Sequence, residues 1–222
     1  MGARADSDAA VAAIFQAKGR PADHPLIVHV ADATQAATFA ASLPPAAQRL
    51  MQAFWPGPVT VIVPRAPGVA AASAGGQDSI GLRCPSHPVA QALLRQAAAL
   101  GVPGVSAPSA NRFGRVSPTS AAHVVAEFGP ELLVLDGGDC PVGIESTIVD
   151  CSRGHPVLLR PGLLTRGALE AALGEPLLAA DAHAPRASGT LASHYAPRAR
   201  VRLWAGDALA AALHDRAMCP PG

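Results

Sequence analysis

The sequence lacks the features that mark membrane, secreted and zinc-stapled proteins. Its longest strongly apolar runs, VTVIV and LLVL, are far shorter than the roughly 20 residues that cross a bilayer. The N-terminus shows no positively charged stretch followed by an apolar block, so it does not read as a secretory signal. Four cysteines (Cys84, Cys140, Cys151 and Cys219) form no C-x-x-C pair, which argues against a zinc knuckle or a disulfide framework. We therefore expect a cytoplasmic protein with buried thiols and no membrane association.

A charge of one sign is also lacking. The 222 residues include 17 Lys and Arg against 16 Asp and Glu, so the formal net charge is +1. At this charge no global field attracts nucleic acid, and contact with RNA would need a local basic patch. Lysine itself is almost absent, because 16 of the 17 basic residues are arginine and Lys18 is the exception. Either chance or the need for a compact ammonium at a phosphate site explains that lysine.

The common nucleotide and hydrolase motifs are absent as well. The chain contains no G-x-x-x-x-G-K-[ST], no G-x-G-x-x-G that opens a helix and no G-x-S-x-G. These absences exclude a P-loop enzyme and a nucleophile-elbow hydrolase. What the chain does have is a set of Ser, Asn, Arg and Lys residues at strand ends and in loops, where polar groups converge on ligands.

Hydrophobic patterning predicts an α/β fold with a twisted, mixed sheet flanked by helices. Apolar segments bounded by Gly, Pro and Asp predict strands over 25–30, 58–63, 79–84, 103–110, 132–138, 146–151 and 156–162. Helical spacing predicts helices over 6–17, 32–42, 44–54, 87–100, 119–128 and 165–173. Residues 1–175 then form one domain, and 176–199, which are rich in Pro, Gly, Ser and His, form a linker. Residues 200–222 read as one strand and one helix that begin a second α/β domain.

Three polar side chains surround the first predicted strand. Lys18 and Arg20 end the first helix, where two neighbouring cations can grip a triphosphate. Positive decoration of a helix C-terminus is the alternative explanation. His29 alternates to one face of the strand, where a hydrogen-bonded core histidine is the commoner case.

The strand 79–84 carries a second group. Ser79, Gly81 and Arg83 share one face because side chains alternate with a period of two. Arg83, at the end of the strand, suits a two-pronged grip on a carboxylate. A surface ion pair is the alternative for this arginine.

The stretch SAPSANRFGRVSPT carries a third group of polar residues. Ser109 and Asn111 share a face, Gly114 permits a tight turn, and Ser117 precedes Pro118 where a helix is expected to start. Hydroxyls, an amide and a helix N-terminus together suit phosphate or ribose oxygens. Turn and capping chemistry explains Ser117 well and Ser109 poorly. The segments GIESTIVD and LLRPG add Ser146, Thr147 and Arg160 at further strand ends.

Nine short segments follow one another along the chain, namely KGRP, HPLIVHV, WPGPVTVIV, GLRCP, SAPSAN, SPT, ESTIVD, LLRPG and SGTLASHYAP. This ordered set resembles the threonylcarbamoyl-AMP synthase family, which has the YrdC-like fold. The resemblance runs from residue 2 to about residue 203, and SHYAP resembles the longer, two-domain form. Enzymes of this family are nucleotidyltransferases that combine L-threonine, bicarbonate and ATP into L-threonylcarbamoyladenylate and pyrophosphate. The product supplies the modification of adenosine 37 in certain tRNAs.

The resemblance implies two groups of site residues. On the ATP side they are Lys18, Arg20, His24, Ser79, Ser109, Asn111, Ser117, Arg160 and Tyr195. On the threonine side they are His29, Arg83, the backbone around Ala107, and Ser146. Lys18 and Arg20 are the catalytic members, which with Mg²⁺ neutralise charge on the departing pyrophosphate. Arg83 holds the threonine carboxylate while the amino group captures CO₂ and the carbamate attacks the α-phosphate, so no side-chain nucleophile is needed.

The chain departs from the family pattern in three places. His24 stands where asparagine is usual, and the linker reads SGTLASHYAP where Ser-Pro-Gly-Met is usual. The opening MGARAD falls where the family has already completed a first strand that carries a threonine-contacting Thr. We therefore expect a chain truncated at both ends, without that strand, and impaired in activity.

Two other functions stay open at this point. A non-catalytic module of the same fold that binds double-stranded RNA or tRNA would use Arg112 and Arg115. Carbamoyl transfer of the hydrogenase-maturation type embeds the fold among zinc-finger-like cysteines, and the chain has none. The wealth of Ser and Arg at strand ends favours the small-molecule enzyme. Beyond its substrates, the expected partners are tRNA or the downstream threonylcarbamoyl transferase machinery.

Overall fold

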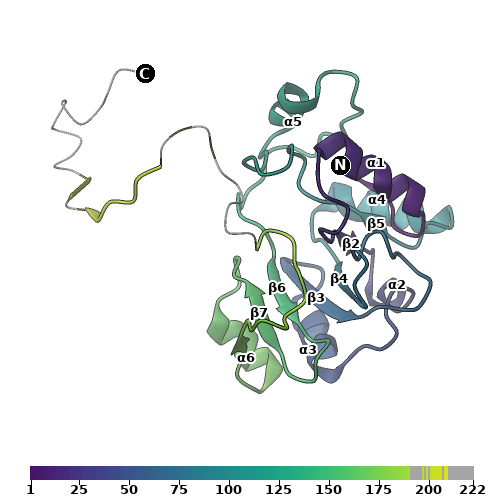
Figure 1. Ribbon diagram of the computed structural model, residues 1–222, viewed down its shortest axis with the longest axis vertical. Helices are drawn as coiled ribbons and strands as arrows, with labels where there is room; N and C mark the ends of the chain where they lie inside the picture. The colour runs from purple at the N-terminus through teal and green to yellow at the C-terminus, as the bar shows by residue number, and fades with distance from the viewer. Residues whose placement is uncertain (191–196, 198, 200, 207, 210–222) are drawn as a thin grey trace.

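Within the described residues, an eight-stranded mixed sheet forms the centre of the protein (Figure 1). The computed structural model describes residues 1–190, 197, 199, 201–206 and 208–209. The strand order is β1-β5-β2-β4-β3-β6-β7-β8. The strands are β1 (Ala3–Arg4), β2 (Ile27–His29), β3 (Val59–Pro64), β4 (Ser79–Arg83), β5 (Val105–Ser106), β6 (Thr147–Asp150), β7 (Val157–Arg160) and β8 (Leu178–Ala179). The expected α/β class with a mixed sheet is confirmed.

Strand β4 lies in the middle of the sheet and pairs on both sides. It runs parallel to β2 and antiparallel to β3, and β3 in turn runs parallel to β6. Gly81 sets the register on both sides, since its partners are Ile27 in β2 and Ile62 in β3. The ends of β2 and β4 therefore lie at the same edge of the sheet as the beginnings of β3 and β6.

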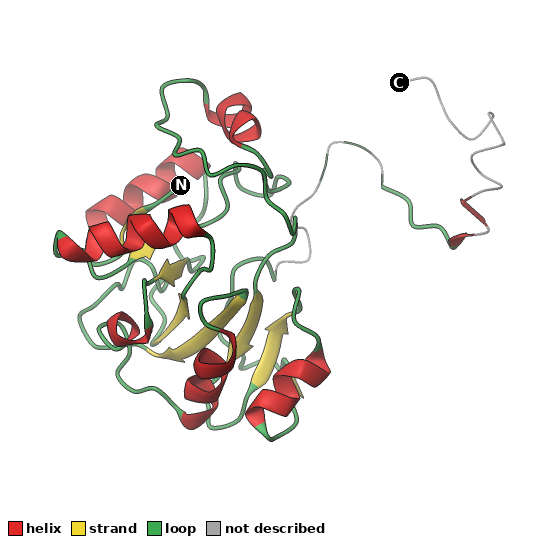
Figure 2. Cartoon of the chain, turned by 180° about the vertical axis from the view of Figure 1, so that it is seen from behind, coloured by secondary structure: helices red, strands yellow, loops and turns green. Residues whose placement is uncertain are grey.

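Three helices cover one face of the sheet, namely α2 (Ala33–Ala36), α3 (Pro45–Phe54) and α6 (Arg166–Leu173) (Figure 2). Helix α3 buries Ala47, Leu50 and Met51, whose spacings of three and four residues place them on one side of the helix. The large core between these helices and the sheet includes Val28, Val30, Phe39, Leu50, Val61, Ile80, Leu82, Val149, Leu169 and Leu173. Burying a side chain of this size stabilises the fold by about 1.5–3 kcal/mol.

Helix α1 (Asp8–Lys18) packs against a second, smaller core. The Ser7 side chain caps it by accepting a hydrogen bond from the backbone N of Ala10 at 3.3 Å. Val11, Ile14 and Phe15 are buried together with Leu26. Lys18 falls on the same stripe, one turn beyond Ile14, so helical geometry carries this charged residue into the interior.

Two further helices flank the other end of the sheet. Helix α4 (Pro88–Ala99) buries Gln91 and Leu94, whereas α5 (Ala121–Phe128) buries no residue and stands apart from the body at the top of Figure 1. An ion pair between Arg115 and Glu127, at 2.9 Å, connects α5 to the preceding loop. None of the helices in the described part of the chain is long and apolar enough to span a bilayer.

The two faces of β4 differ as the alternation predicts. Ile80 and Leu82 are buried in the large core, while Ser79, Gly81 and Arg83 are partly exposed on the opposite face. The helix-covered face is therefore structural, and the opposite face is left to carry polar groups.

Some sequence predictions of strands were wrong. Residues 132–138 form irregular chain, with Leu133 96% and Leu135 64% exposed, and no strand within the described residues pairs with them. The run LLVL is followed by Asp136 and two glycines, of which Gly138 has a φ of +85° that is not a strand conformation. The predicted strand 103–110 shrinks to β5, because Pro103 and Pro108 have no N–H to donate.

The C-terminal and cysteine predictions also need correction. The described residues 201–205 are not in a strand, although the pattern predicted one there, and most of the predicted helix and the segment SHYA lie outside the described residues. Cys84 and Cys151 are buried as expected. Cys140 is exposed, because it lies on the irregular chain that follows 132–138. Cys219 lies outside the described residues.

Replacing Gly104 by alanine should destabilise the fold. A Cβ at this position would lie 2.7 Å from Cε2 of Phe39 and 2.9 Å from Cγ1 of Val28, both fixed in the large core. We expect a loss of about 1–3 kcal/mol in the free energy of unfolding, measured by urea denaturation. Gly167→Ala is the matched control, since nothing lies within 4 Å there and alanine in α6 should gain up to about 1 kcal/mol. Equal effects of the two substitutions would contradict this packing.

Candidate active site

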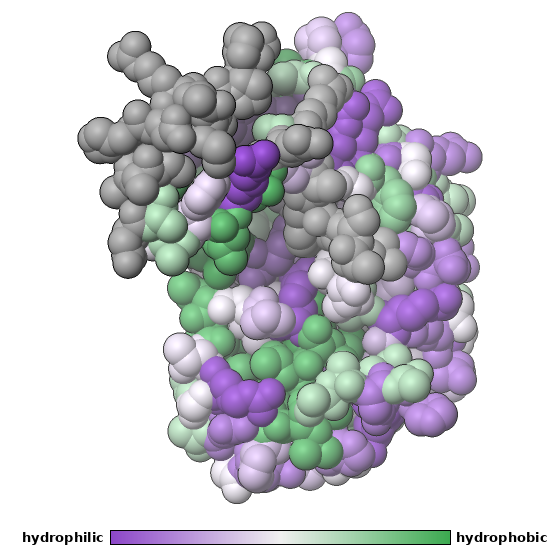
Figure 3. All heavy atoms as spheres, turned by 60° about the vertical axis from the view of Figure 1, so that its left-hand side comes forward, coloured by the Kyte–Doolittle hydropathy of each residue, from purple (hydrophilic) through white to green (hydrophobic). Residues whose placement is uncertain are grey.

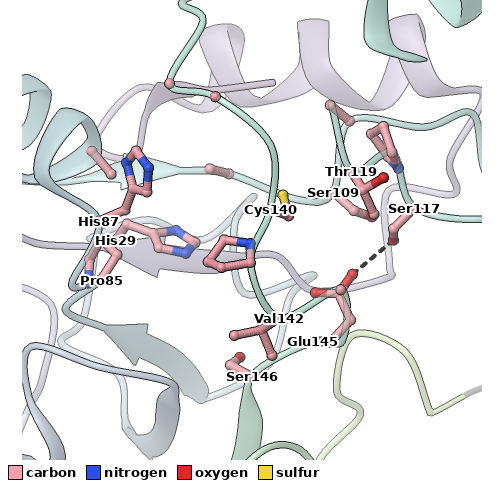
Figure 4. A pocket seen from close by; sticks show the side chains of 18 of the residues that line it. His29, Pro85, His87, Ser109, Ser117, Thr119, Cys140, Val142, Glu145 and Ser146 are labelled. Carbon is pink, nitrogen blue, oxygen red and sulfur yellow. Dashed lines mark hydrogen bonds between the residues drawn. The ribbon is translucent and has the colours of Figure 1, made fainter. Parts of the chain in front are cut away.

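Two adjoining cavities open at the edge of the sheet where β2 and β4 end. Their volumes are about 690 Å³ and about 200 Å³. Segments 83–87, 117–121 and 134–146 line the larger one, together with the start of α4 (Figure 4). The residues that line both cavities are His29, Arg83, Ala107, Ser109, Glu145 and Ser146. The two cavities therefore form one composite site.

The strand arrangement explains this convergence. His29 ends β2 and Arg83 ends β4, and Ser146 immediately precedes β6. Because β3 is antiparallel to β4 and parallel to β6, the start of β6 lies at the same sheet edge as the end of β4. The position is typical of ligand sites in α/β sheets, which lie beyond the strand ends.

The larger cavity has an apolar rim. Leu93, Leu135, Val142 and Leu163 all line it, and each is about half exposed or more. In the space-filling view of Figure 3, hydrophobic side chains also gather in the lower half of the visible face. The site thus combines polar groups at its base with apolar contacts at its mouth, as sites for small molecules commonly do.

The two terminal nitrogens of the Arg83 guanidinium are free to bind a ligand in the composite site. Its Nε donates to the carbonyl oxygen of Gly57 at 3.1 Å, which fixes the plane of the guanidinium. Neither of its two terminal nitrogens donates a hydrogen bond within the described residues. Burial lowers the pKa of Arg83 from its usual value, with Glu145 opposing that shift. Arg83 can therefore offer two parallel N–H donors to a carboxylate.

His29 is neutral in the folded protein. Burial, followed by the charge of Arg83, lowers the pKa of His29 from 6.5 to about 3. Its Nδ1 is buried and has no hydrogen-bond partner among the described residues. The alternative of a hydrogen-bonded core histidine is wrong, because His29 lies at the wall of both cavities and its ring has unused hydrogen-bonding capacity there.

Lys18 reaches the 109–111 loop from beneath. Only 2% of Lys18 is exposed, and its Nζ donates to the backbone carbonyl oxygens of Ser109 and Asn111. Burial, followed by the charge of Arg20, lowers the pKa of Lys18 from 10.5 to about 8. Lys18 lines neither cavity, so its ammonium fixes the loop that carries Ser109.

Arg20 and Arg160 line the smaller cavity and meet at Ser188. Arg20 donates to the carbonyl of Pro25 at 2.8 Å and to Oγ of Ser188 at 3.2 Å. Arg160 donates to the carbonyl of Ser188 at 2.7 Å and to the carbonyl of Ser146 at 2.9 Å. The Ser146 hydroxyl also accepts from Arg160 and bonds the hydroxyl of Thr60 at 2.8 Å. These bonds hold two predicted cations at one wall.

The 111–117 segment is organised differently from the prediction. The Nδ2 atom of Asn111 donates to the carbonyls of Arg112 and Arg115, each at 2.8 Å, so this amide shapes the turn. Ser117 donates to Glu145 at 2.8 Å across the larger cavity (Figure 4). The expected helix start at Ser117 is wrong, because α5 begins later and Ser120 is its cap.

Among the described residues, four predicted site residues line neither cavity, namely Lys18, His24, Ser79 and Asn111. Ser79 lies at the opposite end of β4 from Arg83 and lines a separate, narrow crevice beneath residues 186–188. His24 packs edge-on against Phe113, with ring centroids 5.2 Å apart. Tyr195 lies outside the described residues.

Sequence reasoning missed Glu145, Ser188 and Thr60. Glu145 lines both cavities and stands directly before the predicted Ser146, so its position beside a strand end was the available signal. Ser188 and Thr60 act through contacts to residues far away in the sequence, which no local pattern reveals. Among the described residues no group of three His, Cys, Asp or Glu side chains can hold a metal ion.

Comparisons with known proteins agree with this geometry. The family model described as "Telomere recombination" (Sua5_yciO_yrdC) matches residues 1–162, and "Threonylcarbamoyl-AMP synthase, C-terminal domain" matches residues 164–218. Threonylcarbamoyl-AMP synthase of Pyrococcus abyssi is 40% identical over 207 residues, which are 90% of this chain and 60% of the relative. The Bacillus subtilis protein of the same name is 39% identical over 213 residues, with 93% and 60% covered.

A solved structure agrees as well. The crystal structure of P. abyssi Sua5 complexed with L-threonine matches with a TM-score of 0.81 and 39% identity, covering 88% of this chain and 58% of that one. The fold and site thus define a YrdC-type α/β domain with a ligand site at its sheet edge. The chain belongs to the threonylcarbamoyl-AMP synthase family, as its motifs predicted. It spans about 60% of the length of the curated relatives named above.

The depressed pKa of His29 should make folding stability fall in acid. The folded pKa of about 3 lies below the ordinary 6.5, so on acidification the unfolded chain binds this proton first. The free energy of unfolding should therefore fall as the pH drops below about 6.5, by about 2 kcal/mol at pH 5 from this residue alone. His29→Asn should remove that part of the slope in urea denaturation measured at pH 7 and pH 5.

His87→Asn is the control for this measurement, since His87 lines the same larger cavity but is exposed. Its pH dependence should match the wild type. A His29→Asn chain that keeps the full wild-type slope would refute a buried neutral His29.

Proposed function

We propose that this chain carries the catalytic domain of a threonylcarbamoyl-AMP synthase. The proposed reaction joins L-threonine, bicarbonate and ATP to give threonylcarbamoyl-AMP, pyrophosphate and water. The observation that carries the proposal is the meeting of Arg83, His29 and Ser146 with Arg20 and Arg160 around one cavity. Homologues of that name, and the related crystal structure of P. abyssi Sua5 complexed with L-threonine, support the same assignment.

Threonine fits the part of the site around Arg83. The free fork of Arg83 would bind the carboxylate through two parallel hydrogen bonds, and the neutral His29 and Ser146 lie on the same cavity wall. Ala107 completes this wall, and its backbone N–H donates to the carbonyl of Ile27, so the chain here is fixed. A small, polar amino acid suits a cavity of about 200 Å³.

ATP would occupy the larger cavity, with its phosphates toward Arg20 and Arg160. Both guanidiniums line the smaller cavity that adjoins it, and Ser109 belongs to both. Lys18 would act through the 109–111 loop rather than by direct contact in this state. Mg²⁺ would enter as the MgATP substrate complex, which keeps most of its ligands as phosphate and water.

The chemistry needs positioning and charge stabilisation more than a reactive side chain. Bicarbonate takes up a proton and gives CO₂ and water. The threonine ammonium loses a proton, its nitrogen forms a bond to the carbon of CO₂, and loss of a second N–H proton gives the carbamate. An oxygen of this carbamate attacks the α-phosphorus. The bond from the α-phosphorus to the bridging oxygen breaks, and pyrophosphate takes the electron pair. Fixed guanidinium groups beside the phosphates stabilise the charge that develops on this leaving group. The assignment as a nucleotidyltransferase follows from that step.

The alternative as an RNA-binding module is less well supported. Arg115 is paired with Glu127, and the guanidinium of Arg112 lies over the ring of Phe128 at 5.5 Å. Both arginines thus hold α5 in place.

The proposal has three further parts. It includes contact with tRNA or with the downstream transferase, and a cytoplasmic location. It also includes the division of the chain into a domain, a linker at 176–199 and a second domain. The C-terminal-domain match at residues 164–218 supports that division.

Arg83→Lys should weaken threonine binding by about 1–3 kcal/mol, because the charge stays but the fork geometry is lost. ATP affinity should change by less than about twofold, a difference of about 0.4 kcal/mol. Titration calorimetry with each ligand gives both values. Arg49→Lys, whose ion pair with Glu175 lies outside both cavities, is the matched control and should change neither affinity. Equal loss of both ligands would instead make Arg83 a general structural residue.

Lys18→Ala should weaken ATP binding by about 1–3 kcal/mol, because the 109–111 loop loses two charge-assisted hydrogen bonds. Lys18→Met keeps the apolar stem and should show a similar loss if the ammonium is responsible. Calorimetry with ATP measures the effect, and urea denaturation checks that each variant is folded. Unchanged ATP affinity in both folded variants would reject this role for Lys18.

A further inference from the structure

Glu145 is a carboxylate without an assigned role in the composite site. It is half-buried two residues before the start of β6, and it lines both cavities. Its Oε1 accepts the hydrogen bond from Ser117 (Figure 4). No ion pair within the described residues includes Glu145, and no hydrogen bond to its Oε2 is recorded among them. One carboxylate oxygen is therefore available to a ligand.

The charges around the smaller cavity define what that ligand would be. Among the described residues, its wall carries the guanidiniums of Arg20, Arg83 and Arg160, and Glu145 is the one acidic side chain in its lining. The remaining polar groups are hydroxyls and the neutral ring of His29. Beside Arg83, a ligand with only a carboxylate leaves Glu145 without a donor, and a ligand with only a cationic group meets the guanidiniums. A zwitterion satisfies both signs at once.

We propose that Glu145 accepts a hydrogen bond from the ammonium group of the α-amino-acid substrate and so selects amino acids over other hydroxy acids. The proposal rests on the function proposed above. Arg83 takes the carboxylate of the same molecule, and Glu145 takes its nitrogen, so the two ends of a small zwitterion are read by opposite charges. A ligand that lacks the ammonium leaves the Glu145 carboxylate uncompensated in a partly buried site, which is a strong basis for rejection.

Ser117 then has a positioning role. Its hydroxyl proton is already donated to Glu145, so the same proton is not available to a phosphate oxygen. The bond fixes Oε1 and turns the other oxygen toward the ligand. Glu145→Gln would keep an acceptor for Ser117 while removing the charge. The substitution therefore tests the role of the charge in ligand recognition without breaking this structural hydrogen bond.

The test compares L-threonine with (2S,3R)-2,3-dihydroxybutyrate, in which a hydroxyl replaces the ammonium. Titration calorimetry on the 222-residue chain near pH 7 should give at least about tenfold tighter binding of threonine, which corresponds to about 1.4 kcal/mol. In Glu145→Gln that preference should shrink to within about threefold, a difference of about 0.7 kcal/mol. ATP affinity should not fall by more than about twofold, because the glutamine keeps its bond to Ser117 and removes a negative charge from the cavity wall.

Two variants serve as matched controls. Ser117→Ala removes the hydrogen bond but keeps the Glu145 carboxylate, so most of the preference should survive. Asp136→Asn removes another carboxylate that lines only the larger cavity, and the preference should be unchanged.

The outcomes separate this inference from the function on which it rests. A wild-type chain that binds threonine and the dihydroxy acid equally overturns the inference without recourse to any variant. Retention of the full preference in folded Glu145→Gln overturns it too, while the proposed function stands. A wild-type chain that binds ATP but neither acid overturns the proposed function itself.

Discussion

Main-chain carbonyl groups orient the cations in and beside the composite site. Lys18 donates to the carbonyls of Ser109 and Asn111, and Arg83 donates to the carbonyl of Gly57. Arg20 and Arg160 are bound in the same way to other carbonyls. A carbonyl orients a cation without cancelling its charge, so a cation held in this way still attracts anions. This explains how a chain with a net charge of +1 builds a strongly cationic cavity.

Burying these cations has a cost that depends on pH. The pKa of Lys18 is about 8 in the folded chain against an ordinary 10.5, so the unfolded chain holds this proton more tightly. The contribution of Lys18 to the free energy of unfolding therefore rises as the pH goes from about 8 to about 10.5. Below pH 8 the destabilisation caused by burying this charge is fully present. The protein accepts that cost at neutral pH in order to keep the 109–111 loop in place.

Much of the fold could be predicted from the sequence, because period-two and helical spacing act locally. Ser79, Gly81 and Arg83 do share one face of β4, and Val11, Ile14 and Phe15 do face inward from α1. The run at 132–138 misled the prediction because four apolar residues alone do not supply a partner strand. The residue types of the site could also be predicted, since polar residues at strand ends are visible in the sequence.

Their contacts could not be predicted. Lys18 meets its acceptors 91 and 93 residues away, and Arg160 meets Ser188 across 28 residues. Ser79 lines a different crevice from Arg83, because residues at both ends of a strand can share one face but reach different edges of the sheet. Glu145 was passed over because a lone carboxylate before a strand resembles an ordinary surface residue until its neighbours are known.

The hydrogen bonds made by Ser188 also affect how the protein folds during its synthesis. Its hydroxyl donates to the carbonyl of Pro25 and accepts from Arg20, and its carbonyl accepts from Arg160. The smaller cavity is thus assembled from residues that span positions 20 to 188. Because chains emerge from the ribosome N-terminal end first, the strands before residue 160 can pair well before this wall is closed. A nascent chain cannot acquire the complete cavity until Ser188 has left the exit tunnel, so ligand binding cannot assist the earlier steps of its folding.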